Sequence, residues 1–499
     1  MRIPDTHGSS GASVVPQVEW RVRTPDEEGH DTHIRSLASS LDVPPLVARL
    51  LWLRGIRDEP RARSFLNPRM ADLSPPEGLV GLERATDRLA RALLGGERIA
   101  VCGDYDVDGM TGTSLLVRFL RLAAKPPSTP DEEGQVTWSI PDRQQDGYGL
   151  SIRAIEALAE DGVTVAVTVD NGVTAVEPIR RAVELGMDVI ITDHHLPGDE
   201  VPPALAIVNP RLGAEGPLEG AGAHDLCGCG LAFQLAWAVA DRLRGRGMDA
   251  MKLKSFLRDA IGLVALATVC DVVPLRGQNR LLVAAGLSSL RRSPHPGIQA
   301  LLEVCELGRL PLTTEDVGFK IGPRLNAAGR LGTPEVVIEL LTTDDAARAR
   351  DLAKSLDDAN KERRRIERGV LDEAEAVAKQ LVEERDPSAL VVWGEGWHMG
   401  VVGIVAARLV DKYARPAAVI AFDEGKGRGS CRSVAAVDVH QALEASCDHL
   451  GNWGGHAAAA GLDIDLDSAP AFREAFELSL IHISEPTRLD LASRMPSSA

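Results

Sequence analysis

The sequence predicts an α/β fold, with a doubly wound, mainly parallel sheet in a first domain that long helices join to a second, smaller α/β domain. Short apolar runs rich in β-branched residues, at 98–102, 164–169 and 188–192, have the length and composition of buried parallel strands. Helical patterns lie between them, at 152–160 and 177–185. Because this alternation covers both faces of the sheet with helices, ligands would bind beyond the carboxyl ends of the strands.

The rest of the chain is organised around these strands. Segment 1–33 is polar and rich in Gly, Ser and Pro, which is typical of disorder. Leucines at helical spacing, interrupted by Pro44-Pro45, then predict a helical cap. Alanines and leucines at helical spacing in the charged stretch 344–384 indicate long connecting helices. We therefore expect a cap at 34–74, a sheet domain at 75–290, connecting helices at 291–385 and a second domain at 386–477.

Four motifs carry carboxylates just after or beside an apolar segment. Aspartates gathered at one sheet edge repel one another, and binding divalent cations or protonation relieves that repulsion. Oxygen ligands with one or two imidazoles suit Mn²⁺ or Mg²⁺ better than a metal that prefers thiolates. The motifs therefore predict a two-metal site, and they are Asp104-Tyr105-Asp106-Val107-Asp108-Gly109, Val169-Asp170-Asn171-Gly172, Asp193-His194-His195 and Asp271-Val272-Val273-Pro274.

Each motif also has a simpler interpretation. Asp-x-Asp-x-Asp-Gly could begin a calcium loop, but that loop needs a Glu several residues further on, and 110–116 contains none. Asp170-Asn171-Gly172 alone would be a turn, because Asn-Gly readily adopts positive φ. On a strand, His194 and His195 would point to opposite faces, so that one could hold metal and the other could contact a phosphate.

Composition limits the class of protein without deciding it. The net charge of −17 counts against a nucleic-acid enzyme, although the metal-site aspartates contribute to it and bound cations would neutralise them. The chain has no apolar run of the roughly 18 residues that span a bilayer and no secretory signal, so we expect a cytoplasmic protein without membrane contact. Its seven scattered cysteines fit a reducing compartment. Cys227 and Cys229 lack a second pair at zinc-ligand spacing, which favours buried or turn positions.

The second domain begins with a strand-like run at 389–393, and a second run at 417–422 precedes the glycine-rich segment 424–430. Glycines let backbone N–H groups approach an anion closely, and Ser430 and Arg432 can add side-chain donors. Gly454-Gly455-His456 is expected to form a similar concavity before a helix of small residues. Together these segments predict a phosphate-binding surface.

In this order and spelling, the four acidic motifs resemble those of the DHH phosphoesterase superfamily, and in particular its RecJ branch, the 5′ to 3′ single-strand-specific DNA exonucleases. Further motifs agree, and the similarity covers roughly residues 35–477. Those further motifs lie at 140–143, 147–150, 226–230 and 322–330 in the first part of the chain, and at 398–403, 427–433 and 454–461 in the DHH-associated domain.

The resemblance implies hydrolysis of single-stranded DNA to 5′-mononucleotides by two Mn²⁺ or Mg²⁺ ions, in DNA recombination and repair, with a single-strand-binding protein and a helicase as candidate partners. His195 would contact the scissile phosphate, Asp193 would orient the histidines, and Asp170 would bridge the two ions. The full set of implied metal ligands is Asp104, Asp106, Asp108, Asp170, His194 and Asp271. The implied substrate-binding residues are Arg324, Asn326, Ser430, Arg432, Gly455 and His456.

Three relatives within the superfamily are the alternatives. The nano-RNases or cyclic-dinucleotide phosphodiesterases lack the spelling found here at 271–275 and 322–331. Pyrophosphatases begin their first motif with a histidine where this chain has Cys102. The non-catalytic DHH-fold scaffold of the eukaryotic replicative helicase would be expected to have lost ligands, whereas the expected carboxylates and both histidines are present here.

The last segment is expected to be foreign to the protein. Residues 478–488 read as the translation of a transposase mosaic-end sequencing adapter and residues 493–499 as its far end, so we expect 478–499 to be a read-through artefact. RecJ-like proteins carry an OB-fold after the DHH-associated domain, which binds single strands through a basic groove and stacking aromatics. We therefore expect a C-terminally truncated chain that binds single strands more weakly than the intact protein.

Overall fold

The computed structural model describes residues 30–76, 78–124, 134–141, 149–212, 225–246, 249–308, 311–435 and 437–480. The segment predicted to be disordered lies almost entirely outside these residues, as do the motif residues 142–148 and the tail from 481 onward. The chain divides into two compact units after Asp72. No helix in the described ranges is both long enough and apolar enough to cross a membrane.

The first unit is a small helical cluster. Its helices α1, α2 and α3 pack around Ile34, Leu37, Leu51 and Trp52. Pro45 opens α2, where the missing N–H costs nothing, and the Asp58 carboxylate caps α3 by accepting from the N–H of Arg61. The bounds are His30–Leu41 for α1, Pro45–Trp52 for α2 and Glu59–Leu66 for α3, followed by the 3₁₀ turn Met70–Asp72.

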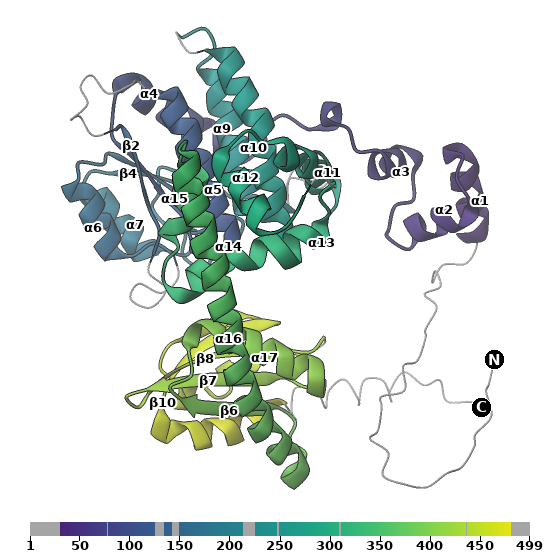
Figure 1. Ribbon diagram of the computed structural model, residues 1–499, viewed down its shortest axis with the longest axis vertical. Helices are drawn as coiled ribbons and strands as arrows, with labels where there is room; N and C mark the ends of the chain where they lie inside the picture. The colour runs from purple at the N-terminus through teal and green to yellow at the C-terminus, as the bar shows by residue number, and fades with distance from the viewer. Residues whose placement is uncertain are drawn as a thin grey trace. The chain divides into compact units, whose positions relative to one another are not determined.

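The second unit contains a five-stranded parallel sheet, here called sheet A, in the order β2-β1-β3-β4-β5. Figure 1 labels its strands β2 and β4. Three of its strands lie at the predicted apolar runs, and their side chains are almost completely buried. The predicted doubly wound parallel sheet is therefore confirmed. The strands are β1 Ile99–Cys102, β2 Val136–Ser139, β3 Val165–Val169, β4 Asp188–Thr192 and β5 Ala206–Val208.

Helices cover both faces of sheet A. Alternate residues of β1 show this, since Ile99 and Val101 belong to one core whereas Ala100 and Cys102 belong to another. The smaller core contains α6 and α7. The larger core contains the other helices of this part of the chain, which are α4 Leu82–Gly95, α5 Val107–Ala123, α9 Gly228–Arg242, α10 Ala250–Cys270, α11 Gly277–Arg292 and α12 Pro296–Val304. The bounds of α6 and α7 are Ile152–Glu160 and Val176–Glu184.

One 40-residue helix, α16, links this part of the chain to the second sheet. Its first turns, at Leu352 and Leu356, pack into the larger core, and its later turns, at Ala374 and Ala378, pack beneath the second sheet. The shorter helices before α16 also contribute to the larger core, so α16 alone has the form of a connection. These segments are α13 Thr314–Asp316, the π-helical turn Val317–Ile321, α14 Gly322–Leu331 and α15 Glu335–Thr342, followed by α16 Ala346–Arg385.

Sheet B is the second, mixed sheet, in the order β6-β7-β8-β10-β9, with only β6 and β7 parallel. Helices α16 and α17 cover one face, on which Val392 and Val419 lie. Helix α18 and the helical residues 469–480 cover the other face, on which Ile420 and Leu462 lie. The elements are β6 Leu390–Glu395, α17 Met399–Tyr413, β7 Ala417–Asp423, β8 Lys426–Arg432, α18 Val439–Glu444, the 3₁₀ turn Cys447–His449, β9 Trp453–His456, β10 Ala459–Asp465 and the 3₁₀ turn Leu466–Ser468.

The glycine-rich segments of this domain lie largely in strands, and the expectation of a helix after His456 is wrong. The glycine-rich segment is mostly strand β8, because Gly427 and Gly429 make room for inward side chains: a Cβ on Gly427 would lie 2.4 Å from the Phe422 ring. The small residues after His456 form a turn and strand β10 instead of a helix. A run of small residues has no apolar periodicity, so local pattern could not separate a hairpin from a helix.

Candidate metal centre

The acidic motifs converge at the carboxyl edge of sheet A. Asp104 and Asp106 follow β1, Asp170 follows β3 and His194 follows β4. Strands β1 and β3 are neighbours at the point where the strand order reverses, which is where doubly wound sheets bind ligands. Asp170 takes a left-handed φ of 64°, a conformation that Asp tolerates better than most side chains.

Asp271 reaches this edge from another direction. The apolar segment before it is helix α10 of the larger core, and Asp271 is the C-cap residue of that helix. Its Oδ2 atom lies 3.6 Å from Nε2 of His194, although the two residues belong to different layers. The end of α10 therefore brings a carboxylate to this edge of sheet A from the helical side.

The candidate ligand atoms lie close enough together to hold ions in common. Nε2 of His194 lies 3.0 Å from Oδ1 of Asp170 and 3.8 Å from Oδ2 of Asp108. Three groups of residues could each hold an ion. Within each group, every residue offers one ligand atom, and these atoms all lie within 4.8 Å of one another. These groups are Asp170 with His194 and His195, Asp108 with His194 and Asp271, and Asp104 with Asp106 and Asp170.

Burial and the clustering of carboxylates make the charged form of these groups unfavourable unless a cation is bound. Burial, followed by the charges of Asp108, Asp106 and Asp104, holds the pKa of Asp170 well above its ordinary value. Burial, followed by Asp108 and Asp106, likewise raises the pKa of Asp271. Burial lowers the pKa of His194, which favours the neutral imidazole that binds metal. Without a counter-charge these carboxyls resist ionisation, and a divalent cation removes that penalty.

The residues present fit divalent cations. Nε2 of His194 and Oδ2 of Asp271 are buried and have no hydrogen-bond partner in the described part of the chain. Carboxylate oxygens and a neutral imidazole suit Mn²⁺ or Mg²⁺. The calcium-loop alternative fails, because Asp106 is the N-cap of α5 and the chain is helical from Val107. A twelve-residue ligand loop cannot form there.

Helix α9 supports the centre, and the sequence did not reveal this role. The N–H groups of Gly228 and Cys229 donate to the two oxygens of Asp108, at 2.6 Å and 2.7 Å. A helix N-terminus stabilises a carboxylate in this way. Cys227 and Cys229 are buried free thiols, at positions that the sequence analysis favoured for them.

The two histidines do not point to opposite faces as expected. Strand β4 ends at Thr192, so the alternation of a strand does not apply, and the ring centroids of His194 and His195 lie only 4.5 Å apart. Nδ1 of His195 lies 2.8 Å from Oδ1 of Asp193, whose Oδ2 accepts from the N–H of Val173. Because a carboxylate can only accept, Nδ1 of His195 carries a proton, and Asp193 fixes the orientation of the ring.

Helix α14, which carries the motif at 322–330, contacts the centre through its backbone. A Cβ on Gly329 would lie 2.0 Å from the carbonyl oxygen of Tyr105, so only glycine fits beside the first acidic motif. The next residue, Arg330, donates from NH1 to the carbonyl oxygen of Gly400 on α17 at 3.1 Å. Sequence reasoning assigned no role to Arg330, which links α14 to the second domain.

Two of the predicted substrate-binding residues also lie on α14. Nε of Arg324 donates to Oδ1 of Asp357 on α16 at 2.8 Å, and its NH1 donates to the carbonyl oxygen of Lys320. Arg324 is thus held by an ion pair within the protein. Asn326 is partly buried two residues further along the helix.

The other four predicted substrate-binding residues lie together on sheet B. The strand register places Ser430, Arg432 and His456 on one face, and the residues between them on that face are Gly454, Ala459 and Gly461. NH1 of Arg432 donates to Oγ of Ser430 at 2.7 Å. Gly455 has a φ of 142°, and a Cβ there would lie 2.5 Å from the backbone of β10, so the hairpin requires glycine.

Comparison with known proteins gives consistent matches along the chain. The model of the DHH family, N-terminal domain, matches residues 98–268, and that of the DHHA1 domain matches residues 386–480. The single-stranded-DNA-specific exonuclease RecJ of Bacillus subtilis is 37% identical over 92% of this chain and 55% of its own length. That of Escherichia coli is 39% identical over 87% of this chain and 74% of its own length. This chain therefore spans about half to three quarters of these relatives.

Solved structures agree. The crystal structure of RecJ from Thermus thermophilus in complex with Mn²⁺ matches with a TM-score of 0.75 at 34% identity, over 90% of this chain and 61% of that chain. The Mg²⁺ complex of the same organism's RecJ matches with a TM-score of 0.68 at 32% identity, over 90% of this chain and 59% of that chain.

Proposed function

The chain belongs to the RecJ family of single-stranded-DNA-specific exonucleases, and from this premise we propose that it removes 5′-mononucleotides stepwise from the 5′ end of single-stranded DNA at a centre of two divalent cations. The observation that carries the proposal is the cluster around His194, whose Nε2 lies within 4 Å of carboxylate oxygens of Asp108, Asp170 and Asp271. The relatives were solved with Mn²⁺ and with Mg²⁺, and the oxygen-rich donor set here suits either ion.

The proposed ligands would lie on two sides of the centre. Asp104 and Asp106 would serve one side of the centre and His194 with Asp271 the other, while the buried Asp170 belongs to both sides and would bridge. Asp108 can bind metal while the α9 N–H groups hold it, since a carboxylate has about four lone-pair sites. When bound, the cations lower the pKa of a coordinated water and stabilise the charge of the reacting phosphate.

The protein's own groups would then position the strand. His195, held by Asp193, would donate to a non-bridging oxygen of the scissile phosphate. Its pKa is raised, because the hydrogen bond and charge of Asp193 outweigh the effect of burial, so the ring retains its second proton to higher pH than an ordinary histidine. That proton makes it a donor suited to an anionic oxygen.

The terminal phosphate would lie on the Gly and Ala floor of sheet B, between Arg432, Ser430 and His456. Among the described residues of β9 and β10, only Gly454, Ala459 and Gly461 lie between these three on that face, so a phosphate could approach the backbone there. Helix α17 borders the site, since a Cβ on its Gly403 would lie 3.1 Å from Oγ of Ser430. Arg324 and Asn326 on α14, between Tyr105 and the second domain, would contact the strand's backbone between the two sites.

The proposed substrate suggests which proteins would act together with this one. An enzyme that consumes single strands requires other proteins to expose or coat them, so we propose a helicase and a single-strand-binding protein as partners, in the cytoplasm, during recombination and repair. Co-purification of either partner with the full chain would test this.

Strands labelled at the 5′ end test direction and product together. With Mn²⁺ or Mg²⁺, the label should appear at once as a 5′-mononucleotide, while the unlabelled remainder shortens by single nucleotides. If the label appears only in long products shortened from the 3′ end, the proposed direction is wrong. A 5′-labelled duplex with blunt ends serves as the matched control and should resist degradation.

A further inference from the structure

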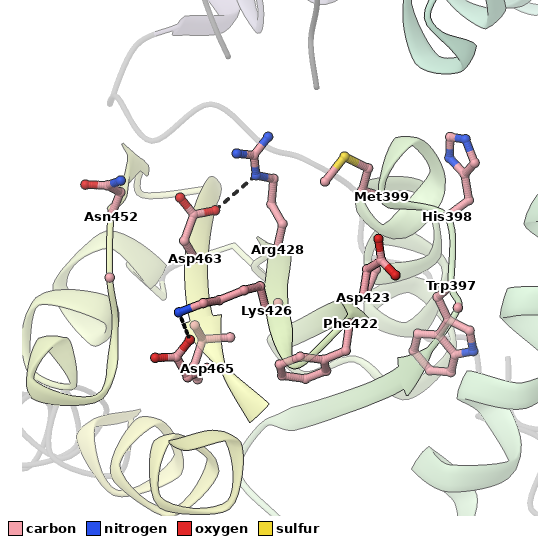
Figure 2. A pocket seen from close by; sticks show the side chains of 15 residues that line it. Trp397, His398, Met399, Phe422, Asp423, Lys426, Arg428, Asn452, Asp463 and Asp465 are labelled. Atoms are coloured by element: carbon pink, nitrogen blue, oxygen red, sulfur yellow. Dashed lines mark hydrogen bonds and ion pairs between the residues drawn. The ribbon is translucent and has the colours of Figure 1, made fainter. Parts of the chain in front are cut away.

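A pocket lies on the same face of sheet B as Ser430 and Arg432. It is a pocket of about 800 Å³, here called the β8 pocket, which is bounded by the loop 396–399, the ends of β7, β8 and β10, and Gly451-Asn452 (Figure 2). Its floor carries Arg428, which lies two residues before Ser430 on the same face of the strand. Two residues of strand advance about 7 Å, so the pocket adjoins the proposed phosphate floor.

The charges of the β8 pocket make it unsuitable for a phosphate. Nε of Arg428 donates to Oδ1 of Asp463 at 3.0 Å, and Nζ of Lys426 donates to Oδ1 of Asp465 at 2.7 Å. Both cations are thus matched by acids from the neighbouring strand, and Asp423 adds a third carboxylate to the lining. The carboxylates of the β8 pocket would repel a phosphate.

The strand register changes this balance within four residues. Opposite Arg428 stands Asp463, whereas opposite Ser430 and Arg432 stand Gly461 and Ala459, which carry no charge. The surface around Ser430 and Arg432 therefore favours an anion, whereas the β8 pocket around Arg428 favours a neutral polar group. A nucleotide has this same polarity, since its phosphate is charged and its base is not.

The side chains of the pocket suit a planar, polar-edged ring. Asp463 holds the guanidinium of Arg428 by Nε, and the sulfur-bearing side chain of Met399 lines the same pocket (Figure 2). Arginine planes stack on bases, and a thioether makes favourable contacts with aromatic rings. Asn452, on the other side of Asp463 in Figure 2, offers both a donor and an acceptor to the edge of a base.

We propose that the β8 pocket binds the nucleobase of the strand's 5′-terminal nucleotide, whose phosphate lies on Ser430 and Arg432. This inference rests on the proposed function, because it assumes that a single strand occupies sheet B. It assigns Arg428 as a residue that contacts the base, and it implies that the terminal base contributes to binding whatever its identity, since all four bases present a face for stacking.

The test compares two 5′-phosphorylated oligonucleotides, one normal and one with an abasic first nucleotide. Their dissociation constants are measured with the full chain in EDTA, so that no hydrolysis occurs. The wild-type protein should bind the abasic strand roughly tenfold more weakly, the effect expected for one lost stacking contact. Arg428→Met should bind both strands equally, within about twofold, because effects on one contact are not additive. Arg415→Met removes an arginine from an ion pair with Asp386 outside the pocket and should keep the wild-type ratio.

Thermal unfolding of both variants shows whether each is folded, and Arg428 is 43% exposed, so its loss should be tolerated. The inference is overturned if the wild-type protein does not discriminate against the abasic strand, or if Arg428→Met retains the full discrimination. Failure of the proposed function looks different, since the protein would then release no mononucleotides when Mn²⁺ is restored, whatever its preference for a terminal base.

Discussion

Gly228 lies directly against Asp170, so that a Cβ built on Gly228 would come within 2.5 Å of the Cβ of Asp170 and 2.8 Å of its Oδ1. The N–H of the same glycine holds Asp108. The first turn of α9 thus fixes two of the proposed metal ligands at once. A change at Gly228 must therefore disturb the centre without removing any ligand.

We expect Gly228→Ala to reduce the affinity for Mn²⁺ by roughly 10- to 100-fold, the range typical of lost ligand support. Isothermal titration calorimetry measures the affinity. The control is Gly369→Ala on the exposed side of α16, where a Cβ meets nothing within 4 Å. That substitution should raise the free energy of unfolding by about 0.5–1 kcal/mol and leave metal binding unchanged. Equal effects of the two substitutions would contradict the proposed role of α9.

Cation binding should stabilise the folded protein. Asp104, Asp106, Asp108, Asp170 and Asp271 lie in one cluster, where burial and neighbouring carboxylates raise the pKa of Asp170 and of Asp271. The unfolded chain does not hold these carboxyls together. At a hundredfold excess over the dissociation constant, an ion that binds only the folded state adds about 2.7 kcal/mol. Thermal unfolding with EDTA and with Mn²⁺ measures this, and Asp271→Asn should lose much of the shift. A melting temperature that ignores Mn²⁺ would count against the centre.

Arg330 should matter for activity without affecting metal binding. Its NH1 donates to the carbonyl oxygen of Gly400, while the adjacent Gly329 lies against Tyr105 in the first acidic motif. We expect Arg330→Met to lower kcat/KM on single-stranded DNA about tenfold, as loss of one charged hydrogen bond of about 1.5 kcal/mol implies. The control Arg348→Met removes an exposed pair with Glu339 and should change kcat/KM less than twofold. A loss of Mn²⁺ affinity in Arg330→Met would show that its role lies in the metal centre instead.

Acid should destabilise the protein through His295. This buried histidine accepts the N–H of Gly297 at the start of α12, and burial, followed by the charge of Arg118, lowers its pKa to about 3. The unfolded value is about 6.5, so the contribution to stability is complete above that pH and is lost as the pH falls toward 3. At pH 5.5, one unit below the unfolded pKa, the loss should be about 1.4 kcal/mol.

Urea unfolding at pH 7.5 and pH 5.5 checks this. His295→Asn keeps a capping side chain but cannot titrate, so its loss of stability between the two values should be smaller than that of the wild-type protein by about that amount. An identical loss in both proteins would show that His295 does not carry the effect.

Sequence pattern predicted the parts of the fold that depend on local periodicity. Strands β1, β3 and β4 lie where runs of β-branched residues indicated them, and the ligands that directly follow them could be placed at one edge. Asp271 could not be placed correctly, because the end of α10 meets that edge only through the packing of α10 on α5 and α9. The support from Gly228 was missed for the same reason.

The second domain shows a different limit. In β8, Gly427 and Gly429 alternate with polar residues, so the strand has no apolar side of its own, and Phe422 and Leu462 from neighbouring strands fill the space instead. Strand β8 is therefore stable only when the neighbouring strands pack against it. Packing requires the glycines that we expected to bring backbone N–H groups close to an anion, and the same register places Ser430, Arg432 and His456 together on the face that carries Val419.

The central claim is that the cluster around Asp170 hydrolyses DNA, and Asp170→Ala tests it most directly. The measurement is the rate of mononucleotide release from 5′-phosphorylated single-stranded DNA with Mn²⁺, beside circular dichroism and thermal unfolding of the same preparations. We predict that the wild-type protein degrades the strand only when the cation is present, and that Asp170→Ala remains folded but releases mononucleotides at least a thousandfold more slowly, a loss of about 4 kcal/mol. Full activity of the folded variant, or a wild-type protein that binds the strand but never cuts it, as a scaffold would, contradicts the account.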